Sequence, residues 1–321
     1  MNHAEDSCLR VAMWSGPRNI STAMMRSFEN RSDCQVVDEP FYAAYLATTG
    51  LEHPGFEEIV ASQPTRWQTV AERLTTERPA AVYFQKHMTQ HLLEGMDLSF
   101  TRELRNCFLI RDPARIILSY ARVRPSFSLE ELGIPQQVAL FNAECERLGE
   151  APPVLDAALT LADPERVLRR LCQLLGIEFE AGMLRWPAGP RTTDGVWSPY
   201  WYSRVLESTG FESTLSAAPS RDAPSTDVPS SDVPSRDIHS RDESKEDKAP
   251  QRGARPVVAN AKSKQVTKQV TRRRDGDSAV EAQVKTTAPL DQLKDEQLEM
   301  YALAQRSYEQ LRRYAIDGAS V

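Results

Sequence analysis

The 321-residue sequence contains no apolar run close to the ~20 residues that a transmembrane helix needs, so no membrane span is expected. It has no excess of basic residues: the formal net charge is -6, which argues against nucleic acid as a partner and leaves only local anion sites. Its five cysteines are scattered and form no C-x-x-C pair, so they predict free thiols in a reducing compartment. The first residues are acidic and lack the apolar stretch of a signal peptide, so the protein is expected to be cytoplasmic.

Phe, Trp and Tyr are missing between residues 216 and 289, where a five-residue pattern that begins PSRDA recurs over 219–243 and a basic stretch follows. Such a composition cannot bury enough apolar surface to offset its chain entropy. We therefore expect an α/β domain over residues 1–215, a low-complexity disordered insert over 216–288, and a C-terminal helix within 289–321 that packs back on the domain. An expanded linker is the simple interpretation of the insert, and a phosphorylation-regulated or anion-binding tail is the alternative.

Short apolar runs alternate with helical patterns along the first 180 or so residues, which is typical of an α/β fold with a mainly parallel sheet flanked by helices. The apolar runs predict strands at 10–14, 35–38, 80–84, 106–110 and 154–157. The 3.6-residue patterns predict helices at 21–31, 41–48, 67–77, 88–94, 113–122, 135–148, 164–175 and 290–314. Asp163 followed by Pro164 predicts the start of one helix, and Gly176 predicts its end.

Two strand–loop–helix units are the most informative feature of the sequence. The first, LRVAMWSGPRNISTAMMRSF, covers residues 9–28, and the second, CFLIRDPARIILSYAR, covers 107–122. A loop that leads from a strand into a helix is suited to anion binding, because free backbone N–H groups and the positive end of the helix dipole converge there. Two such units predict a ligand with two separated phosphate-like groups.

The first loop lacks the Gly-Lys pair of the nucleoside-triphosphate motif G-x-x-x-x-G-K-[ST], which argues against ATP or GTP. Its Arg18 has the planar fork that binds two oxygens of a phosphate or sulfate. The alternative for this loop is an ordinary turn that Ser21 caps, with Arg18 in solvent. For the second unit the alternative is a helix that Asp112 merely caps.

The two units together resemble the signatures of the sulfotransferase family. The stretch PRNIST at residues 17–22 falls on the family's P-[KR]-S-G-[ST]-T loop, and Arg111-Asp112-Pro113 with Ser119 falls on its R-[ND]-P motif, about 90 residues further along. The similarity is greatest to a subgroup of bacterial sulfotransferase-like proteins and plant proteins named after branched-chain aminotransferases, on the stretches VVDEPFYAAYL, FQKHM and DGVWSPYWY. Ile20 stands where the family usually has Gly, and Asn19 stands where it has Ser.

The resemblance implies a three-layer P-loop-type fold and 3′-phosphoadenosine-5′-phosphosulfate as co-substrate, with no metal. It implies that the sulfuryl group moves to a hydroxyl or amine of a small-molecule acceptor. The donor-binding residues it implies are Arg18, Asn19, Ser21 and Thr22 in the first loop, and Arg111 and Ser119 for the 3′-phosphate. A P-loop-fold kinase or nucleotide hydrolase is the alternative function, and the departures at Asn19 and Ile20 favour a non-catalytic binding protein as a third.

Sulfuryl transfer needs a base for the acceptor and positive charge near the leaving phosphate. His87 follows Lys86 after an apolar run, as a His does in some sulfotransferases, and imidazole suits proton abstraction near neutral pH. Glu39 follows the second predicted strand, as a Glu base does in others. We rank Glu39 and His87 nearly equal as bases, with Lys86 as a sulfuryl ligand; a structural histidine and a helix-capping carboxylate are the alternatives.

The late segment TTDGVWSPYWY, residues 192–202, is rich in aromatic residues. Such a cluster is suited to an acceptor platform or to stacking with adenine. Packing of a late loop onto the core is an equally good interpretation.

Overall fold

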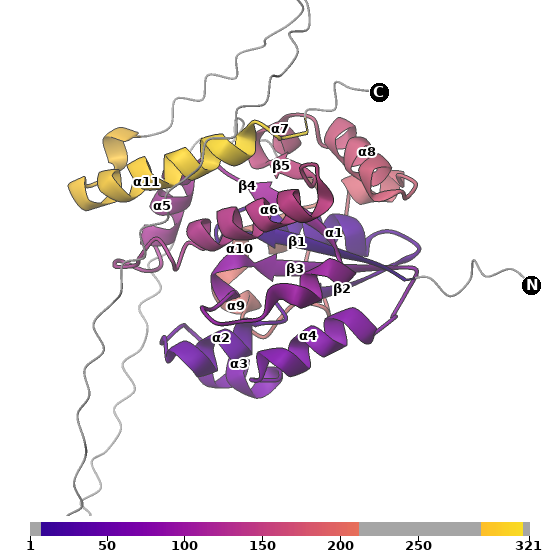
Figure 1. The fold of residues 1–321 in the computed structure, drawn as a ribbon, viewed down its shortest axis with the longest axis horizontal. Helices are drawn as coiled ribbons and strands as arrows, with labels where there is room; N and C mark the ends of the chain where they lie inside the picture. Colours follow the sequence, from indigo (N-terminus) through magenta and orange to yellow (C-terminus); the bar gives the residue numbers. More distant parts are fainter. Residues whose placement is uncertain (1–7, 212–289, 317–321) are drawn as a thin grey trace, which may run out of the picture. The chain divides into compact units, whose positions relative to one another are not determined.

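The computed structural model describes residues 8–211 and 290–316. The predicted insert over 216–288 lies outside the described residues. A five-stranded, all-parallel sheet forms the centre of the fold, with the strand order β2-β3-β1-β4-β5 (Figure 1). The strands are β1 (Leu9–Ser15), β2 (Cys34–Asp38), β3 (Val82–Met88), β4 (Arg105–Ile110) and β5 (Val154–Asp156). The predicted fold class is confirmed.

Helices cover both faces of the sheet, as parallel strands require, because each crossover between them carries helical chain. The first part of the chain forms α1 (Ser21–Glu29), α2 (Tyr42–Thr49), α3 (Phe56–Ser62), α4 (Trp67–Thr76) and the 3₁₀ segments η1 (Thr89–His91) and η2 (Leu98–Glu103). The rest forms α5 (Pro113–Ala121), α6 (Ile134–Leu148), α7 (Ala157–Ala162), α8 (Pro164–Leu175), η3 (Ala181–Leu184), α9 (Ser198–Trp201), α10 (Ser203–Glu207), η4 (Leu290–Gln292) and α11 (Asp295–Arg312).

Alternation along the strands divides the core between the two faces. Val11 and Met13 of β1 pack with α1 and α8 on one face, whereas Ala12 and Trp14 pack with α4 and α6 on the other. All four β1 side chains are fully buried. Residue parity on a strand therefore decides which helical layer a side chain meets, and this matters for the polar residues at the ends of the strands.

The C-terminal helix α11, yellow in Figure 1, contacts α5 and α6. Tyr308 donates a hydrogen bond of 2.6 Å to Asp156 at the end of β5, and the N–H of Ile316 bonds the carbonyl of Val154 at 2.8 Å. With Leu311 fully buried in the core, this helix is part of the layer that covers β4 and β5.

All five predicted strands exist, and Asp163 caps α8 as predicted, accepting a bond from the N–H of Arg166 at 3.2 Å. The predicted helix at 88–94 is wrong: β3 runs on to Met88, and the chain then forms only a short 3₁₀ turn. Sequence patterns also missed the short helices α3, α7, α9 and α10. The predicted strand ends at residue 84, short of Met88, because the last residues of β3 are polar yet buried.

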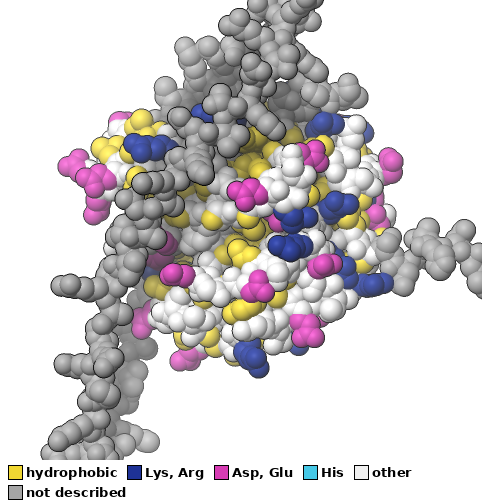
Figure 2. Space-filling view, in the orientation of Figure 1, with side chains coloured by type: hydrophobic (Ala, Val, Ile, Leu, Met, Phe, Trp, Pro, Cys, Tyr) yellow, Lys and Arg dark blue, Asp and Glu magenta, His cyan; other side chains and the backbone are white. Residues whose placement is uncertain are grey.

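Within the described residues, no helix is both long and apolar enough to cross a membrane. On the face drawn in Figure 2, basic and acidic side chains are interspersed rather than gathered in one patch. No histidine shows there, in keeping with the burial of His53, His87 and His91.

Candidate active site

The strand order brings the loops predicted to bind anions side by side. β1 lies between β3 and β4, so the loop after β1 is flanked by the carboxyl ends of both neighbours. β2 pairs with β3 in the register that sets Asp38 beside Lys86. In parallel α/β sheets, ligands bind in the crevice beyond the carboxyl ends of the strands, where the chain order reverses.

Arg18 and Ser119, predicted from separate motifs, are in direct contact. The Nε of Arg18 donates to the Oγ of Ser119 at 3.0 Å, and the guanidinium of Arg111 donates to the carbonyl of Arg18. Arg18 has a left-handed backbone with a φ of 56°, which is uncommon for a residue with a side chain. Such conformations cluster at ligand sites, because the surroundings must hold them in place.

The positive charge of this pair of arginines is only partly offset: Asp112 favours the charged form of Arg111, but by less than burial and the neighbouring arginines disfavour it. Among the residues that the structure describes, no carboxylate forms an ion pair with Arg18 or Arg111. Burial, together with Arg115, Arg18 and Arg204, lowers the pKa of Arg111 to about 10. Burial, Arg204 and Arg122 likewise lower the pKa of Arg18. A half-buried guanidinium cluster of this kind is suited to a ligand with several negative charges.

The N-terminus of α1 adds backbone donors to the same place. Ile20 is the N-cap residue and no side chain caps the helix, so the N–H groups of its first turn lack a side-chain acceptor. Ser21 and Thr22 open this helix. Asn19 instead ties the loop to β4, donating to the carbonyl of Leu109 at 3.1 Å and accepting from the N–H of Ile20 at 2.8 Å.

The second helix differs, because Asp112 caps α5 by accepting from the N–H of Ala114 at 2.9 Å. The anion-binding capacity of the second unit therefore comes from its side chains, Arg111 and Ser119, more than from the end of its helix. A small pocket lies beside Arg111 and is bounded by Asn19 and by Tyr308 of α11.

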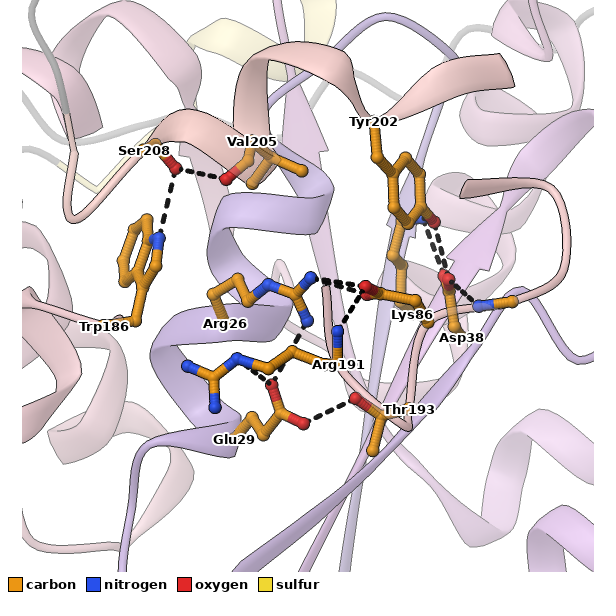
Figure 3. Close-up of polar contacts among 12 residues, drawn as sticks. Arg26, Glu29, Asp38, Lys86, Trp186, Arg191, Thr193, Tyr202, Val205 and Ser208 are labelled. Carbon is orange, nitrogen blue, oxygen red and sulfur yellow. Dashed lines mark hydrogen bonds and ion pairs between the residues drawn. The ribbon is translucent and has the colours of Figure 1, made fainter. Parts of the chain in front are cut away.

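Lys86 lies at the centre of a buried polar cluster on the α1 face of the sheet. Its ammonium donates to Asp38 at 2.8 Å, to Glu39 at 2.7 Å and to the hydroxyl of Tyr202 at 2.5 Å, so all three of its N–H groups have partners. Tyr202 in turn donates to Asp38 at 2.6 Å and accepts from the indole of Trp197 at 3.1 Å. Figure 3 shows Tyr202 reaching from the junction of α9 and α10 toward Asp38 and Lys86.

The cluster contains two carboxylates for one ammonium. Burial and the neighbouring Asp38 raise the pKa of Glu39, although Lys86 opposes the shift. Burial by itself lowers the pKa of Lys86, but the two carboxylates outweigh it and raise the pKa overall. Glu39 also has a left-handed φ of 38°, fixed by a bond of 2.9 Å from its N–H to the carbonyl of Lys86. The structure thus holds a carboxylate with raised basicity beside a stable cation.

His87 points to the other face of the sheet, as its parity on β3 requires. Its ring stacks on Trp14 with centroids 4.1 Å apart, lies 5.7 Å from Phe41, and bonds Gln85 at 3.1 Å. Burial lowers the pKa of His87 to about 3. The structure therefore brings Lys86 and Glu39 together with each other, and does not bring His87 to them.

The loop that carries Asp194 is fastened to α1 and β2, as Figure 3 shows. Fully buried Arg26 forms an ion pair with Asp194 at 2.6 Å, and Thr193 donates to Glu29. The N–H of Gly195 donates to Asp38 at 3.1 Å, which fixes the carboxylate that holds Lys86.

Sequence reasoning missed the roles of Asp38 and Tyr202 as partners of Lys86, and missed Arg204 beside the arginines. The signal for the first two was available in part. Asp38 precedes Glu39 at a strand end, and Tyr202 belongs to the aromatic segment already singled out. No sequence pattern around Arg204 indicates that it lies beside Arg18 and Arg111.

Residues 9–236 match the family described as a sulfotransferase domain. Two curated relatives from Arabidopsis thaliana, the branched-chain-amino-acid aminotransferase-like proteins 2 and 1, are 38% and 39% identical over 204 residues, which is 63% of this chain but 36% of each relative. The chain thus spans little more than a third of the length of these relatives.

Solved structures with a similar arrangement include the sulfotransferase domain of the Synechococcus PCC 7002 olefin synthase, with 15% identity, a TM-score of 0.44, and coverage of 67% of this chain and 88% of that one. Another is mouse sulfotransferase SULT7A1 complexed with PAP, with 10% identity, a TM-score of 0.31, and coverage of 55% and 61%. The family match covers well over half of the sequence and begins with the first strand of the sheet. The chain therefore belongs to the sulfotransferase domain family.

Proposed function

We propose that this protein transfers a sulfuryl group from 3′-phosphoadenosine-5′-phosphosulfate to a hydroxyl or amine of a small-molecule acceptor. The observation that carries the proposal is the contact between Arg18, Ser119 and Arg111, which come from the two signature motifs. The guanidinium groups of Arg18 and Arg111 form no ion pair with a described carboxylate. A donor with phosphate at both ends of its ribose supplies the matching negative charge.

The two loops bind different ends of the donor. The N–H groups at the start of α1, with Ser21, Thr22 and Arg18, hold the phosphosulfate, and Arg111 with Ser119 holds the 3′-phosphate. Asn19 shapes the loop through its bond to Leu109.

In the transfer step, the acceptor oxygen forms a bond to sulfur while the bond from sulfur to the 5′-phosphate oxygen breaks. Glu39 takes the acceptor proton, and 3′-phosphoadenosine-5′-phosphate is released. Once protonated, Glu39 attracts Lys86 less strongly, and this frees an N–H of Lys86 for the negative charge that develops on the departing oxygen. The raised pKa of Glu39 makes it a better proton acceptor than an exposed carboxylate.

Glu39 is preferred to His87 as the base because of their surroundings. Glu39 touches Lys86, whereas His87 lies on the opposite face of β3 among Trp14, Phe41 and Gln85.

The chain is also proposed to work in the cytoplasm, since all five cysteines are free thiols, as is usual in a reducing compartment.

Isothermal titration with 3′-phosphoadenosine-5′-phosphate, with 5′-AMP, and with ATP plus Mg²⁺ tests the donor assignment. We expect the bisphosphate to bind at least about 100-fold more tightly than 5′-AMP, because only it engages both arginine subsites. A preference for ATP with Mg²⁺ would instead support the kinase alternative. Tight bisphosphate binding without transfer to any acceptor would support a non-catalytic binding protein.

A further inference from the structure

The aromatic segment DGVWSPYWY, residues 194–202, supplies two hydrogen-bond donors to one oxygen of Asp38. The N–H of Gly195 donates to this oxygen at 3.1 Å, and the hydroxyl of Tyr202 donates to it at 2.6 Å. The indole of Trp197 in turn donates to the Tyr202 hydroxyl at 3.1 Å. Both rings are buried, with Trp197 1% and Tyr202 4% exposed. The segment therefore packs onto Asp38 and does not leave these two rings free to bind a ligand.

Asp38 holds Lys86 beside the proposed base. The second oxygen of Asp38 accepts from the Lys86 ammonium at 2.8 Å, while the same ammonium donates to Glu39 at 2.7 Å. The ammonium that faces the reaction is thus held by a carboxylate whose own position is fixed by the segment 194–202.

A buried ion pair fastens the start of this segment to α1. The guanidinium of Arg26 contacts the two oxygens of Asp194 at 2.6 and 2.7 Å, and both side chains are buried. Asp194 also accepts from the N–H of Arg191 at 2.8 Å. Figure 3 shows the Arg26 side chain pointing from α1 toward this loop. Because the loss of one partner leaves the other charge buried and unpaired, such a pair holds its loop in one place.

Gly195 is a position of the segment that has no room for a side chain. A Cβ atom there would lie 2.1 Å from the indole ring of Trp197. Glycine permits this close approach of the ring to the backbone, and the N–H of Gly195 then faces Asp38. A side chain at this position would displace either the ring or the N–H.

We propose that residues 194–202 form a clamp that positions Asp38, and through it Lys86, for the transfer step. The Arg26–Asp194 ion pair locks this clamp onto α1. The two residues of the pair act through the clamp and not on the reacting atoms, so they are positioning residues. The inference rests on the proposed function and extends it, because a misplacement of about 1 Å caused far from the chemistry can lower the rate about 100-fold.

The clamp also sets the charges around the proposed base. Glu39 interacts electrostatically with Lys86, Asp38, and the hydroxyls of Tyr202 and Tyr42. Burial raises the pKa of Glu39 most, Lys86 opposes this, and Asp38 raises the pKa further. When the clamp loosens, Asp38 moves away from Glu39 and water enters, and both changes lower the pKa of Glu39. Loss of folded protein alone leaves that pKa where it is.

Two variants loosen the clamp in different ways. Asp194→Asn keeps the size of the side chain but removes the charge that pairs with Arg26, whereas Gly195→Ala changes no charge and displaces the Trp197 ring. NMR of isotope-labelled glutamate carboxyls follows the titration of Glu39 in the full chain, and its signal is the one absent from Glu39→Gln. In both variants we expect Glu39 to titrate at lower pH than in the unmodified chain.

Activity and donor affinity give the second measurement. The kcat for transfer from radioactive donor to an acceptor alcohol should fall at least about tenfold in both variants. Affinity for 3′-phosphoadenosine-5′-phosphate should stay within about twofold. The matched control is Asp33→Asn, which removes a carboxylate paired with buried Arg31 at 2.8 Å, just before the start of β2. It should change neither kcat nor the titration of Glu39.

An unmoved titration of Glu39 in both variants would overturn the clamp, and so would an unchanged kcat or an equal shift in Asp33→Asn. A lower kcat without a shifted titration would mean that the ion pair serves stability alone, which also contradicts the proposal. If Asp194→Asn does not fold, Gly195→Ala decides. If the unmodified chain binds no bisphosphate, the proposed function itself fails, while the titration of Glu39 still tests the clamp.

Discussion

Replacing Arg111 with alanine should weaken binding of 3′-phosphoadenosine-5′-phosphate by about 100-fold or more. The ligand phosphate would then lie in a largely desolvated site without its counter-ion, a change that costs about 3–5 kcal/mol, and each 1.4 kcal/mol is a factor of ten in affinity. Arg18→Ala should have an effect of similar size, because it also removes the bond to Ser119. Isothermal titration of the bisphosphate measures both.

The stability of the ligand-free protein separates this loss from misfolding. Burial and neighbouring arginines disfavour the charged form of Arg111, and this offsets the loss of its bond to the Arg18 carbonyl, so its removal should change the melting temperature little. Arg111→Lys keeps the charge but loses the planar fork, and should fall between the wild type and the alanine variant. Arg169→Ala, whose side chain is 57% exposed and paired with Glu165 on α8, is the matched control. Equal affinity in the Arg111 and Arg169 alanine variants would contradict a two-phosphate site.

The sheet was predictable because its strands are buried on both faces and appear in the sequence as continuous apolar runs. The same runs located the two loops, and the neighbouring places of β1 and β4 then explain why Arg18 meets Ser119 and Arg111. Neither contact can be predicted from the spacing of these residues in the sequence alone. Both contacts depend on the strand order, which is set by interactions between segments far apart in the sequence.

The end of β3 was not predictable in the same way. Gln85, Lys86 and His87 are polar, and a hydrophobic pattern ends at Phe84, yet all three are at most 1% exposed. Their burial is possible only because partners come from elsewhere: Asp38 and Glu39 from the end of β2, Tyr202 from the junction of α9 and α10, and the carbonyl of Leu74 for Gln85. With the strand ended too early, the parity that separates Lys86 from His87 was hidden, and the two bases ranked nearly equal.

Because Lys86 and His87 lie on opposite faces of β3, kinetic comparison of variants at Glu39 and His87 identifies the base. Glu39→Gln should reduce kcat about 10²- to 10⁴-fold, the usual contribution of a general base, while affinity for 3′-phosphoadenosine-5′-phosphate stays within about twofold. The amide keeps the size of the side chain and a carbonyl oxygen for Lys86, so the buried cluster retains most of its contacts. Transfer of label from radioactive donor to an acceptor alcohol, with titration of the bisphosphate in parallel, measures the two quantities.

The pH dependence of kcat/KM distinguishes Glu39 from His87 as the base. A base must be deprotonated to act, so kcat/KM of the wild type should fall as the pH drops through the pKa of Glu39, which burial raises above the usual range of a glutamate. Glu39→Gln should lack this acidic limb. His87→Gln, which alters a neutral ring stacked on Trp14 on the other face of the sheet, should change kcat less than about tenfold and keep the limb. A loss of the limb in His87→Gln, with Glu39→Gln still active, would reverse the assignment of the base and require the end of β3 to rearrange when the donor binds.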